Sequence, residues 1–240
     1  MNASLPPQPT VPRSEQEDEP TIQPELDRGH PGASAAREHR RRRANREART
    51  RRRHPLLGGL LLAISNSPQH ERAWQTGRRG EERVGLSLER RTANGPAIVL
   101  HDRRMPGGYG NVDHLAIAPR GVFVIDAKAV KGKVRIAQPL FGKPKLMVAG
   151  RNRTKLVDGL DRQVDAVRRA LVEGGCGDVP VHGVLCFTKA DLPLLGICQI
   201  RGHRLHYCRA TARKLNRSGP YEKDAIDRIA RQLAVAFPAA

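Results

Sequence analysis

The amino-acid sequence predicts an α/β fold: a mixed β-sheet flanked by helices and preceded by a disordered N-terminal tail. Apolar residues recur at helical spacing from residue 71 onward and again over residues 154–171. Between these stretches, residues 97–129 contain a succession of strand-like runs. Strands that alternate with helices pack as a sheet between helical layers. Residues 1–54, by contrast, hold almost no apolar side chain to bury, which is typical of disorder.

The tail also contains a strongly basic run. The chain of 240 residues has 43 Lys and Arg against 24 Asp and Glu, a formal net charge of +19. Residues 37–54 account for +8 of this excess and residues 55–240 for +15, whereas residues 1–36 are acidic. Such a surface favours a polyanionic partner, of which nucleic acid is the commonest, and a merely solubilising surface is the alternative. The arginines predicted to contact nucleic acid are Arg40, Arg41, Arg42, Arg43, Arg51, Arg52 and Arg53.

A short apolar segment, residues 56–64, follows the basic run. It is much shorter than the roughly 20 residues that cross a bilayer, and we expect no transmembrane segment anywhere in the chain. The segment is interpreted as docking on the folded domain, and contact of residues 37–64 with a membrane surface is the alternative. The predicted boundary assigns residues 1–69 to the tail and residues 70–240 to one domain. With no secretory signal and no zinc or disulfide pattern among its four cysteines, the chain is expected to be cytoplasmic.

The first predicted helix begins near Glu71. At 100° per residue, one face of this helix gathers Ala73, Gly77, Glu81, Val84 and Leu88. Glu81 therefore lies on the stripe that faces the core. A carboxylate on such a stripe needs a cation or a metal as its partner, because burying it bare is costly.

Three strand-like runs follow, at residues 97–100, 111–118 and 122–129, and residues 133–137 and 145–148 are predicted to add a further hairpin. A turn at Pro119-Arg120-Gly121 joins the second run to the third. If this turn pairs Ala118 with Gly121, the same register pairs Asp113 with Asp126. A three-residue loop with a left-handed Gly121 would instead shift the register by one and turn the two carboxylates to opposite faces.

The remaining segments complete the predicted sheet and its helical layers. Residues 154–171 form an amphipathic helix with Gln163 at the edge of its apolar stripe. Residues 179–187 read as a buried strand, residues 197–208 as another strand or pair of strands, and residues 225–237 as a closing helix.

The residues best suited to chemistry belong to the hairpin and the first helix. Asp126 and Lys128 share one face of the most hydrophobic strand, although a strand that emerges into solvent with a surface ion pair is the alternative. Asp113 would face Asp126 at about 5 Å, which is destabilising unless a cation lies between them. His114 alternates away from Asp113 and is expected to pack as a structural histidine. Carboxylates such as these are the ligands that Mg²⁺ prefers, and a carboxylate-held metal beside an amine suits phosphodiester hydrolysis.

These residues resemble the nuclease-related domain (NERD) family, a branch of the PD-(D/E)xK nuclease superfamily. The resemblance covers residues 74–187 and rests on the runs Gly77-Arg78-Arg79-Gly80-Glu81, Asn111-Val112-Asp113-His114-Leu115 and Gly121-Val122-Phe123-Val124-Ile125-Asp126-Ala127-Lys128, the last followed by Gly132. Two positions depart from the pattern. Val112 replaces the proline of the superfamily name, and Asp126 stands where this branch more often has Glu.

The resemblance implies an αβββαβ core and a set of roles. Glu81 would be a helix-borne metal ligand, Asp113 the main metal ligand and Asp126 the acid of the D-x-K motif. Lys128 would position the nucleophilic water, and Gln163 would line the site. The implied cofactor is Mg²⁺ or Mn²⁺, and the implied activity is hydrolysis of phosphodiester bonds in DNA or, second, RNA. A non-catalytic nucleic-acid-binding module that retains the fold is the alternative function.

Overall fold

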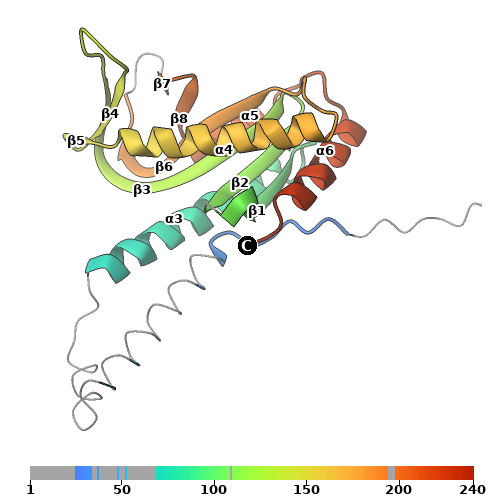
Figure 1. Ribbon diagram of the computed structural model, residues 1–240, viewed down its shortest axis with the longest axis horizontal. Helices are drawn as coiled ribbons and strands as arrows, with labels where there is room; N and C mark the ends of the chain where they lie inside the picture. The colour runs from blue at the N-terminus through green and yellow to red at the C-terminus, as the bar shows by residue number, and fades with distance from the viewer. Residues whose placement is uncertain are drawn as a thin grey trace, which may run out of the picture.

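The computed structural model describes residues 25–33, 37, 48, 52, 69–108, 110–193 and 198–240. Within them the elements follow the order α3 (Gln69–Thr92), β1 (Ile98–Arg104), the 3₁₀ turn η1 (Pro106–Gly108), β2 (Asn111–Ala118), β3 (Gly121–Ala137), β4 (Lys145–Val148), β5 (Arg151–Asn152), α4 (Thr154–Glu173), β6 (Val181–Asp191), β7 (Gln199–Ile200), β8 (His203–Tyr207), α5 (Cys208–Leu215) and α6 (Lys223–Ala236). The predicted α/β class is confirmed (Figure 1).

The sheet is mixed, as predicted. Its strands lie in the order β1-β2-β3-β6-β8-β7, and β4 and β5 extend from the far half of β3. Strand β3 pairs with β2 and β4 antiparallel and with β6 parallel, and β6 pairs with β8 parallel. Elements α3, β1, β2, β3, α4 and β6 therefore form the expected αβββαβ core, with the small β4–β5 hairpin inserted before α4.

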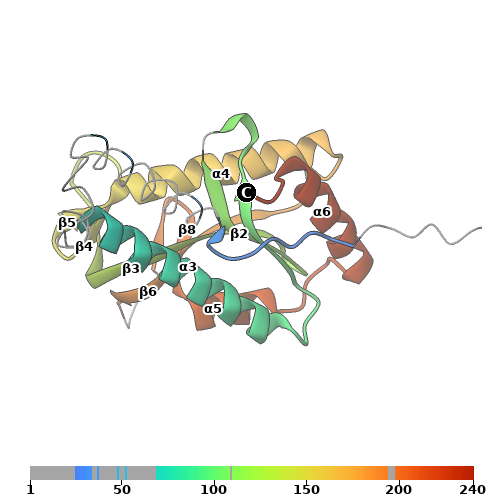
Figure 2. The ribbon, with the colours of Figure 1, turned by 90° about the horizontal axis from the view of Figure 1, so that it is seen from below.

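Two helices cover each face of the sheet (Figure 2). Val84 and Leu88 of α3 pack with α5 residues against one face, while α4 and α6 close the other. Alternation along the strands divides the core accordingly: Val124 packs on the α4 side and Ile125 on the α3 side. The inward stripe predicted for the first helix thus holds at Val84 and Leu88, whose side chains are fully buried.

Strand β3 is longer than expected. It runs without a break through the two runs predicted as separate, residues 122–129 and 133–137, and reaches 17 residues. Its register against β6 shifts between Lys128 and Lys131, which is where the sequence pattern had indicated a break. The strand therefore carries the D-x-K residues in its middle and continues beyond them into a hairpin with β4.

The N-terminal tail requires a correction at residues 25–33, which lie against the domain. The Arg28 carbonyl accepts the His101 N–H of the edge strand β1 at 2.7 Å. The buried Arg103 guanidinium donates to the carbonyls of Asp27 and of Ala234 and Phe237 in the C-terminal region. These contacts are made to the backbone of a Pro- and Gly-containing segment, so apolar patterning could not indicate them.

Two further expectations need comment. Helix α5 was not predicted: the strand or pair of strands expected at residues 197–208 ends at Cys208, where the helix begins, and residues 209–215 were assigned to no element. It buries only Thr211, Ala212 and Leu215, too few apolar positions to give a helical pattern. The predicted apolar segment at residues 56–64 lies outside the described residues. None of the helices in the described part of the chain combines the length and apolar character needed to cross a bilayer.

Candidate functional site

The hairpin between β2 and β3 has the register that brings the two aspartates together. Ala118 pairs with Gly121, and the pairing continues to His114 with Ile125, so Asp113 and Asp126 are the next residues along the two strands. Gly121 does adopt a positive φ of 113°, yet the loop remains Pro119-Arg120 and the register does not shift. Glycine is required there because a Cβ would lie 2.3 Å from the Pro180 carbonyl oxygen.

The two carboxyl groups are in contact. Asp113 hydrogen bonds Asp126, and its Oδ2 also accepts the Ala127 backbone N–H at 2.7 Å. Burial, and after it the neighbouring Asp126 charge, raise the pKa of Asp113 to about 7, although Lys128 and the Ala127 N–H lower it. Asp113 therefore exchanges a proton near neutral pH, in the place where the sequence argument required a cation.

Lys128 supplies the cation of the cluster. Its Nζ lies 2.6 Å from Asp126 Oδ1, and the two side chains are 22% and 9% exposed. Burial would lower the pKa of Lys128, but Asp126 and then Asp113 outweigh burial and raise it above the ordinary value. The amine is therefore protonated at neutral pH. Partial burial of both partners excludes the expected alternative of a surface ion pair at a solvent-exposed strand end.

Glu81 reaches the carboxyl cluster from helix α3. Its carboxylate accepts the Gly32 backbone N–H at 3.1 Å. Burial and then the charges of Asp113 and Asp102 raise the pKa of Glu81 to about 9. Gly80 allows this approach, because a Cβ at that position would lie 2.6 Å from Ala129 Cβ on β3. Gly80 thus allows helix α3 to pack closely on β3, a role that the sequence did not reveal.

Gln163 lies next to the site through the backbone of β2. Its Nε2 donates to the Asn111 carbonyl at 3.0 Å, two residues before Asp113. Its Oε1 is buried and has no hydrogen-bond partner among the described residues. Gln163 thus connects α4 to the strand that carries Asp113 through the Asn111 carbonyl.

His114 is a structural histidine, as predicted. It is fully buried, and its Nδ1 lies 2.9 Å from Nδ1 of His101 on the paired strand β1. Burial, and after it His101, lower the pKa of His114 well below the ordinary value, so the imidazole is neutral. The ring packs on the α3 side of the sheet, near Gly85.

The donor set suits a cation only in part. Asp113 and Asp126 present hard oxygen atoms of the kind that Mg²⁺ prefers, and the pKa of Asp113, raised to about 7, lets this acid exchange its proton for a cation near neutral pH. Glu81 is engaged by Gly32. Among the described residues, no group of three or more His, Cys, Asp and Glu side chains stands ready to hold a metal ion. The aspartate pair fits a divalent cation, and Glu81, which accepts the Gly32 N–H on Oε1, would join it on losing the proton that its raised pKa holds.

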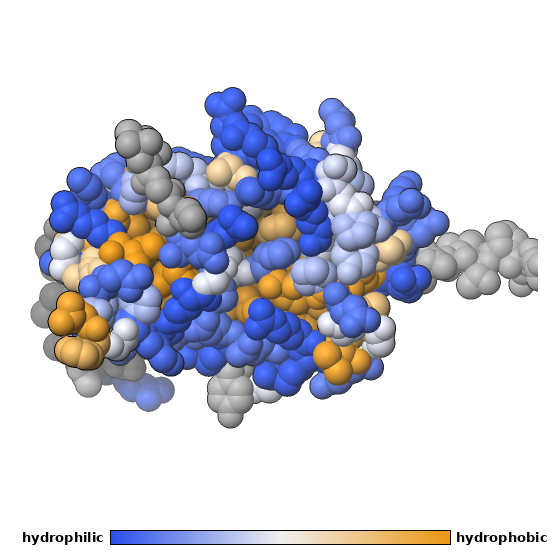
Figure 3. Space-filling model, turned by 90° about the horizontal axis from the view of Figure 1, so that it is seen from above, coloured by the Kyte–Doolittle hydropathy of each residue, from blue (hydrophilic) through white to orange (hydrophobic). Residues whose placement is uncertain are grey.

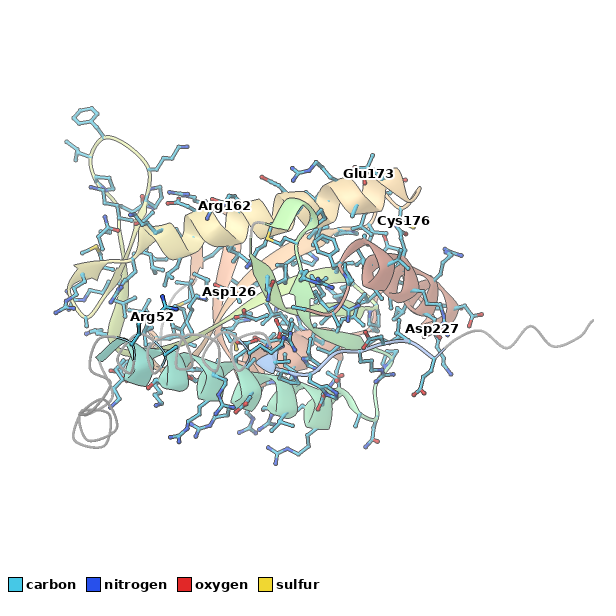
Figure 4. All side chains as sticks on the ribbon, turned by 60° about the horizontal axis from the view of Figure 1, so that its bottom comes forward. Arg52, Asp126, Arg162, Glu173, Cys176 and Asp227 are labelled. Carbon is cyan, nitrogen blue, oxygen red and sulfur yellow. The ribbon has the colours of Figure 1, made fainter. Side chains whose placement is uncertain are left out.

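The basic residues near this cluster differ from those predicted. Of the seven arginines expected to bind nucleic acid, only Arg52 belongs to the described residues, where it is exposed (Figure 4). Instead, nine Lys and Arg and no acid occur between Asp126 and Asp158. Most of these belong to the β3–β4 hairpin, which projects from one end of the sheet (Figure 1). The sequence signal for it was the absence of acids over this stretch.

Comparison with known families agrees with the geometry. Residues 76–188 match the family model described as NERD, the nuclease-related domain. The matched range contains the carboxyl pair, Lys128, Glu81 and Gln163, and it confirms the resemblance noted from the motifs. Comparison with curated proteins and with solved structures gave no match.

Proposed function

We propose, on the premise that residues 76–188 form a nuclease-related domain, that this chain hydrolyses phosphodiester bonds of nucleic acid, with DNA the expected substrate ahead of RNA. The observation that carries the proposal is the contact between the Asp113 and Asp126 carboxyls beside the Lys128 amine. Two carboxyl groups are rarely buried against each other without a functional reason. Binding a shared cation is the simplest such reason.

In this proposal Asp113 and Asp126 hold Mg²⁺ or Mn²⁺, and Glu81 is a third ligand once its carboxyl is deprotonated. When bound, such an ion neutralises charge on the phosphodiester and makes water a stronger nucleophile. Asp113 is held for this role by the Ala127 N–H, which fixes the direction of its carboxylate. With its pKa at about 7, Asp113 gives up its proton readily near neutral pH.

Lys128 would then orient the attacking water and hydrogen bond the scissile phosphate. Its raised pKa keeps the amine protonated, so it acts as a donor and a positive charge rather than as a general base. Asp126 holds the amine at 2.6 Å and thereby directs it toward the same space as the Asp113 carboxyl. Gln163 would support the site indirectly, by fixing the start of β2 through the Asn111 carbonyl.

The surface supports nucleic acid as the substrate class. Hydrophilic residues make up most of the face shown in Figure 3. The β3–β4 hairpin continues the strand that carries Lys128, so a strand of nucleic acid bound along its cations would lead to the aspartate pair. At its tip, Leu140 and Phe141 are 94% and 88% exposed. Exposed apolar side chains on a basic arm are suited to insertion between bases.

A second candidate function is nucleic-acid binding without cleavage. Two observations favour it: the pKa of Glu81 is raised to about 9, so its carboxyl stays protonated at neutral pH, and the described residues offer no ready three-ligand metal group. Binding through phosphate neutralisation would weaken steeply with salt and would survive EDTA, whereas cleavage would stop in EDTA.

The experiment compares cleavage by the wild type, Asp113→Asn and the control Asp178→Asn, whose side chain is exposed and outside the site. Supercoiled plasmid, linear duplex, single-stranded DNA and RNA are each incubated with Mg²⁺ or Mn²⁺ and with EDTA. We expect cleavage of at least one DNA form that requires the metal and falls by about 100-fold or more in Asp113→Asn only. A wild type that cleaves none of the four substrates with either ion would leave the binding function as the better account.

A further inference from the structure

A cavity separate from the carboxyl cluster lies where β2 turns into β3. Its volume is about 400 Å³, and its wall includes Arg120, Phe123, His182, Arg204, Lys214 and Arg217. Phe123 is the β3 residue in the cavity wall, and Asp126 lies three residues further along that strand, about 10 Å at the usual rise per residue, with its side chain on the opposite face of the sheet. The cavity is therefore distinct from the carboxyl cluster.

The walls of this cavity are fixed by backbone hydrogen bonds from three segments of the chain. The Val122 N–H donates to the Pro180 carbonyl at 2.9 Å, and the Tyr221 N–H donates to the Pro119 carbonyl at 3.1 Å. Gly219 packs so closely that a Cβ there would lie 2.2 Å from the Pro119 carbonyl oxygen. The cavity is thus part of the folded framework.

The cavity concentrates positive charge that no acid balances. Four cationic groups line it: Arg120, Arg204, Lys214 and Arg217. Within the part of the chain that the structure describes, none of the four forms an ion pair with a carboxylate. Burial, and then Arg217, Arg204 and Arg120 in turn, lower the pKa of Lys214. Like charges held together without a counter-ion repel one another, and an anion that enters the cavity relieves this repulsion.

An aromatic pair stands beside these cations. The rings of Phe123 and His182 lie with centroids 4.7 Å apart and planes inclined by 38°. His182 Nε2 is within 3.2 Å of the Arg120 carbonyl, which orients the imidazole. Burial lowers the pKa of His182, so its ring is a neutral planar surface at physiological pH. The volume falls in the range of about 300–1,000 Å³ typical of small-molecule sites, and it accommodates a planar base beside a phosphate.

We propose that this cavity binds the phosphate group of a mononucleotide-sized ligand, with Arg204, Lys214 and Arg217 contacting the phosphate and the Phe123–His182 pair contacting the base. The ligand is either a free nucleotide or the phosphorylated end of a nucleic-acid strand. The site does not depend on hydrolysis at the carboxyl cluster, and it binds phosphate whether or not the chain is a nuclease.

The test titrates adenosine 5′-monophosphate and adenosine into the full chain by isothermal calorimetry at constant ionic strength. The pocket variant is Lys214→Gln/Arg217→Gln. The matched control is Arg209→Gln/Arg213→Gln, which removes the same charge from exposed positions of α5. We expect the monophosphate, and not adenosine, to bind the wild type and the control with a Kd below about 1 mM, and the pocket variant to bind about tenfold more weakly or not at all. Arg204→Gln provides a second, independent variant.

A second set of titrations distinguishes a free nucleotide from a strand end as the ligand. It measures the binding of oligothymidylates with a 5′-phosphate or a 5′-hydroxyl in the presence of EDTA. Tighter binding of the phosphorylated strand that disappears in the pocket variant identifies a strand end as the ligand. Equal binding of both strands together with pocket-dependent binding of the monophosphate identifies a free nucleotide. The proposal is overturned if the pocket and control variants bind every phosphorylated probe equally, or if no phosphorylated probe binds more tightly than its unphosphorylated counterpart. Loss of nuclease activity would not alter either outcome.

Discussion

The Nζ of Lys128 lies 2.6 Å from Oδ1 of Asp126, two residues earlier on the same strand. This pair balances the charge of Asp126 within the protein, while burial, and after it the charge of Asp126, raise the pKa of Asp113 to about 7. The arrangement leaves one acid ready to exchange a proton for a cation near neutral pH. It also makes Lys128 the residue through which the charge of the cluster is balanced.

Replacing Lys128 by methionine keeps the length of the side chain and removes its charge. We expect the cleavage rate to fall by about 100-fold or more, because the amine no longer orients water or the phosphate. We also expect the pKa of Asp113 to rise further, since Lys128 is one of the groups that lower it. Cleavage assays and carboxyl-resolved NMR titration measure the two effects. Lys223→Met, at the exposed start of α6, is the control, and an equal loss in both variants would argue against a site role.

The metal-free protein should lose stability as the pH rises. Asp113 and Glu81 have folded-state pKa values of about 7 and about 9, above their ordinary values near 4. The folded state therefore binds more protons than the unfolded state between these limits, and deprotonation favours unfolding. Urea unfolding at pH 5 and at pH 8.5 should differ by more than about 1 kcal/mol, with a smaller difference in Asp113→Asn. A stability that increases over this interval would contradict the described carboxyl contacts.

Displacing residues 25–33 should free Glu81. Gly29 has φ +67°, and a Cβ there would lie 2.3 Å from the His101 carbonyl oxygen, so Gly29→Ala should detach the segment that carries Gly32. We expect Mn²⁺ affinity to increase, because detaching the segment lessens the burial of Glu81, which is the largest cause of its raised pKa, and this effect outweighs the lost Gly32 hydrogen bond. Gly108→Ala introduces a similar backbone strain, φ +76°, in open space and serves as the control. Unchanged Mn²⁺ affinity in Gly29→Ala would exclude Glu81 as a ligand limited by this contact.

The tip of the β3–β4 hairpin should contribute to nucleic-acid binding and not to stability. Leu140 and Phe141 are almost fully exposed, so Leu140→Ser/Phe141→Ser should change the unfolding free energy by less than about 0.5 kcal/mol. Fluorescence anisotropy with a labelled duplex should show weaker binding. Val235→Ser on α6, where Val235 is 83% exposed, is the apolar control. If the tip variant and the control bind the duplex with equal affinity, the tip does not contact nucleic acid.

The cations of the same hairpin should set the salt dependence of binding. Lys143→Gln/Lys145→Gln should reduce the slope of log affinity against log salt by about 1 for each lost phosphate contact. Duplex titrations over a series of NaCl concentrations measure this slope. An unchanged slope would mean that nucleic acid binds elsewhere, and the cavity near Lys214 would be the next place to examine.

The sequence was sufficient to predict most of the fold because helical and alternating patterns are local. The sequence left two registers open for the β2–β3 hairpin, and the structure has the one that pairs Ala118 with Gly121 and brings Asp113 beside Asp126. Helix α5 was not predicted, because only three of its eight residues are buried and they give no helical pattern of apolar residues. The division of β3 into two runs was wrong because Lys131 and Lys133 interrupt the apolar pattern without ending the strand.

The candidate site was predicted to a similar extent. An acidic residue within an apolar strand is conspicuous in a sequence, and Asp113 and Asp126 both have apolar neighbours. The contact from Gly32 to Glu81 joins residues 49 positions apart through a backbone N–H, which leaves no pattern in the sequence. The cavity beside Arg204 and Lys214 likewise depends on three segments that meet only in the folded chain.

The most direct test of the central claim is the affinity of the wild type and of Asp113→Asn for Mn²⁺, measured by isothermal calorimetry at pH 8 with Asp178→Asn as the control. If Asp113 and Asp126 share a cation, the wild type and the control bind Mn²⁺ alike, and Asp113→Asn binds it at least about tenfold more weakly. Equal affinity of all three proteins, or no binding by any of them, would contradict a metal site at the aspartate pair.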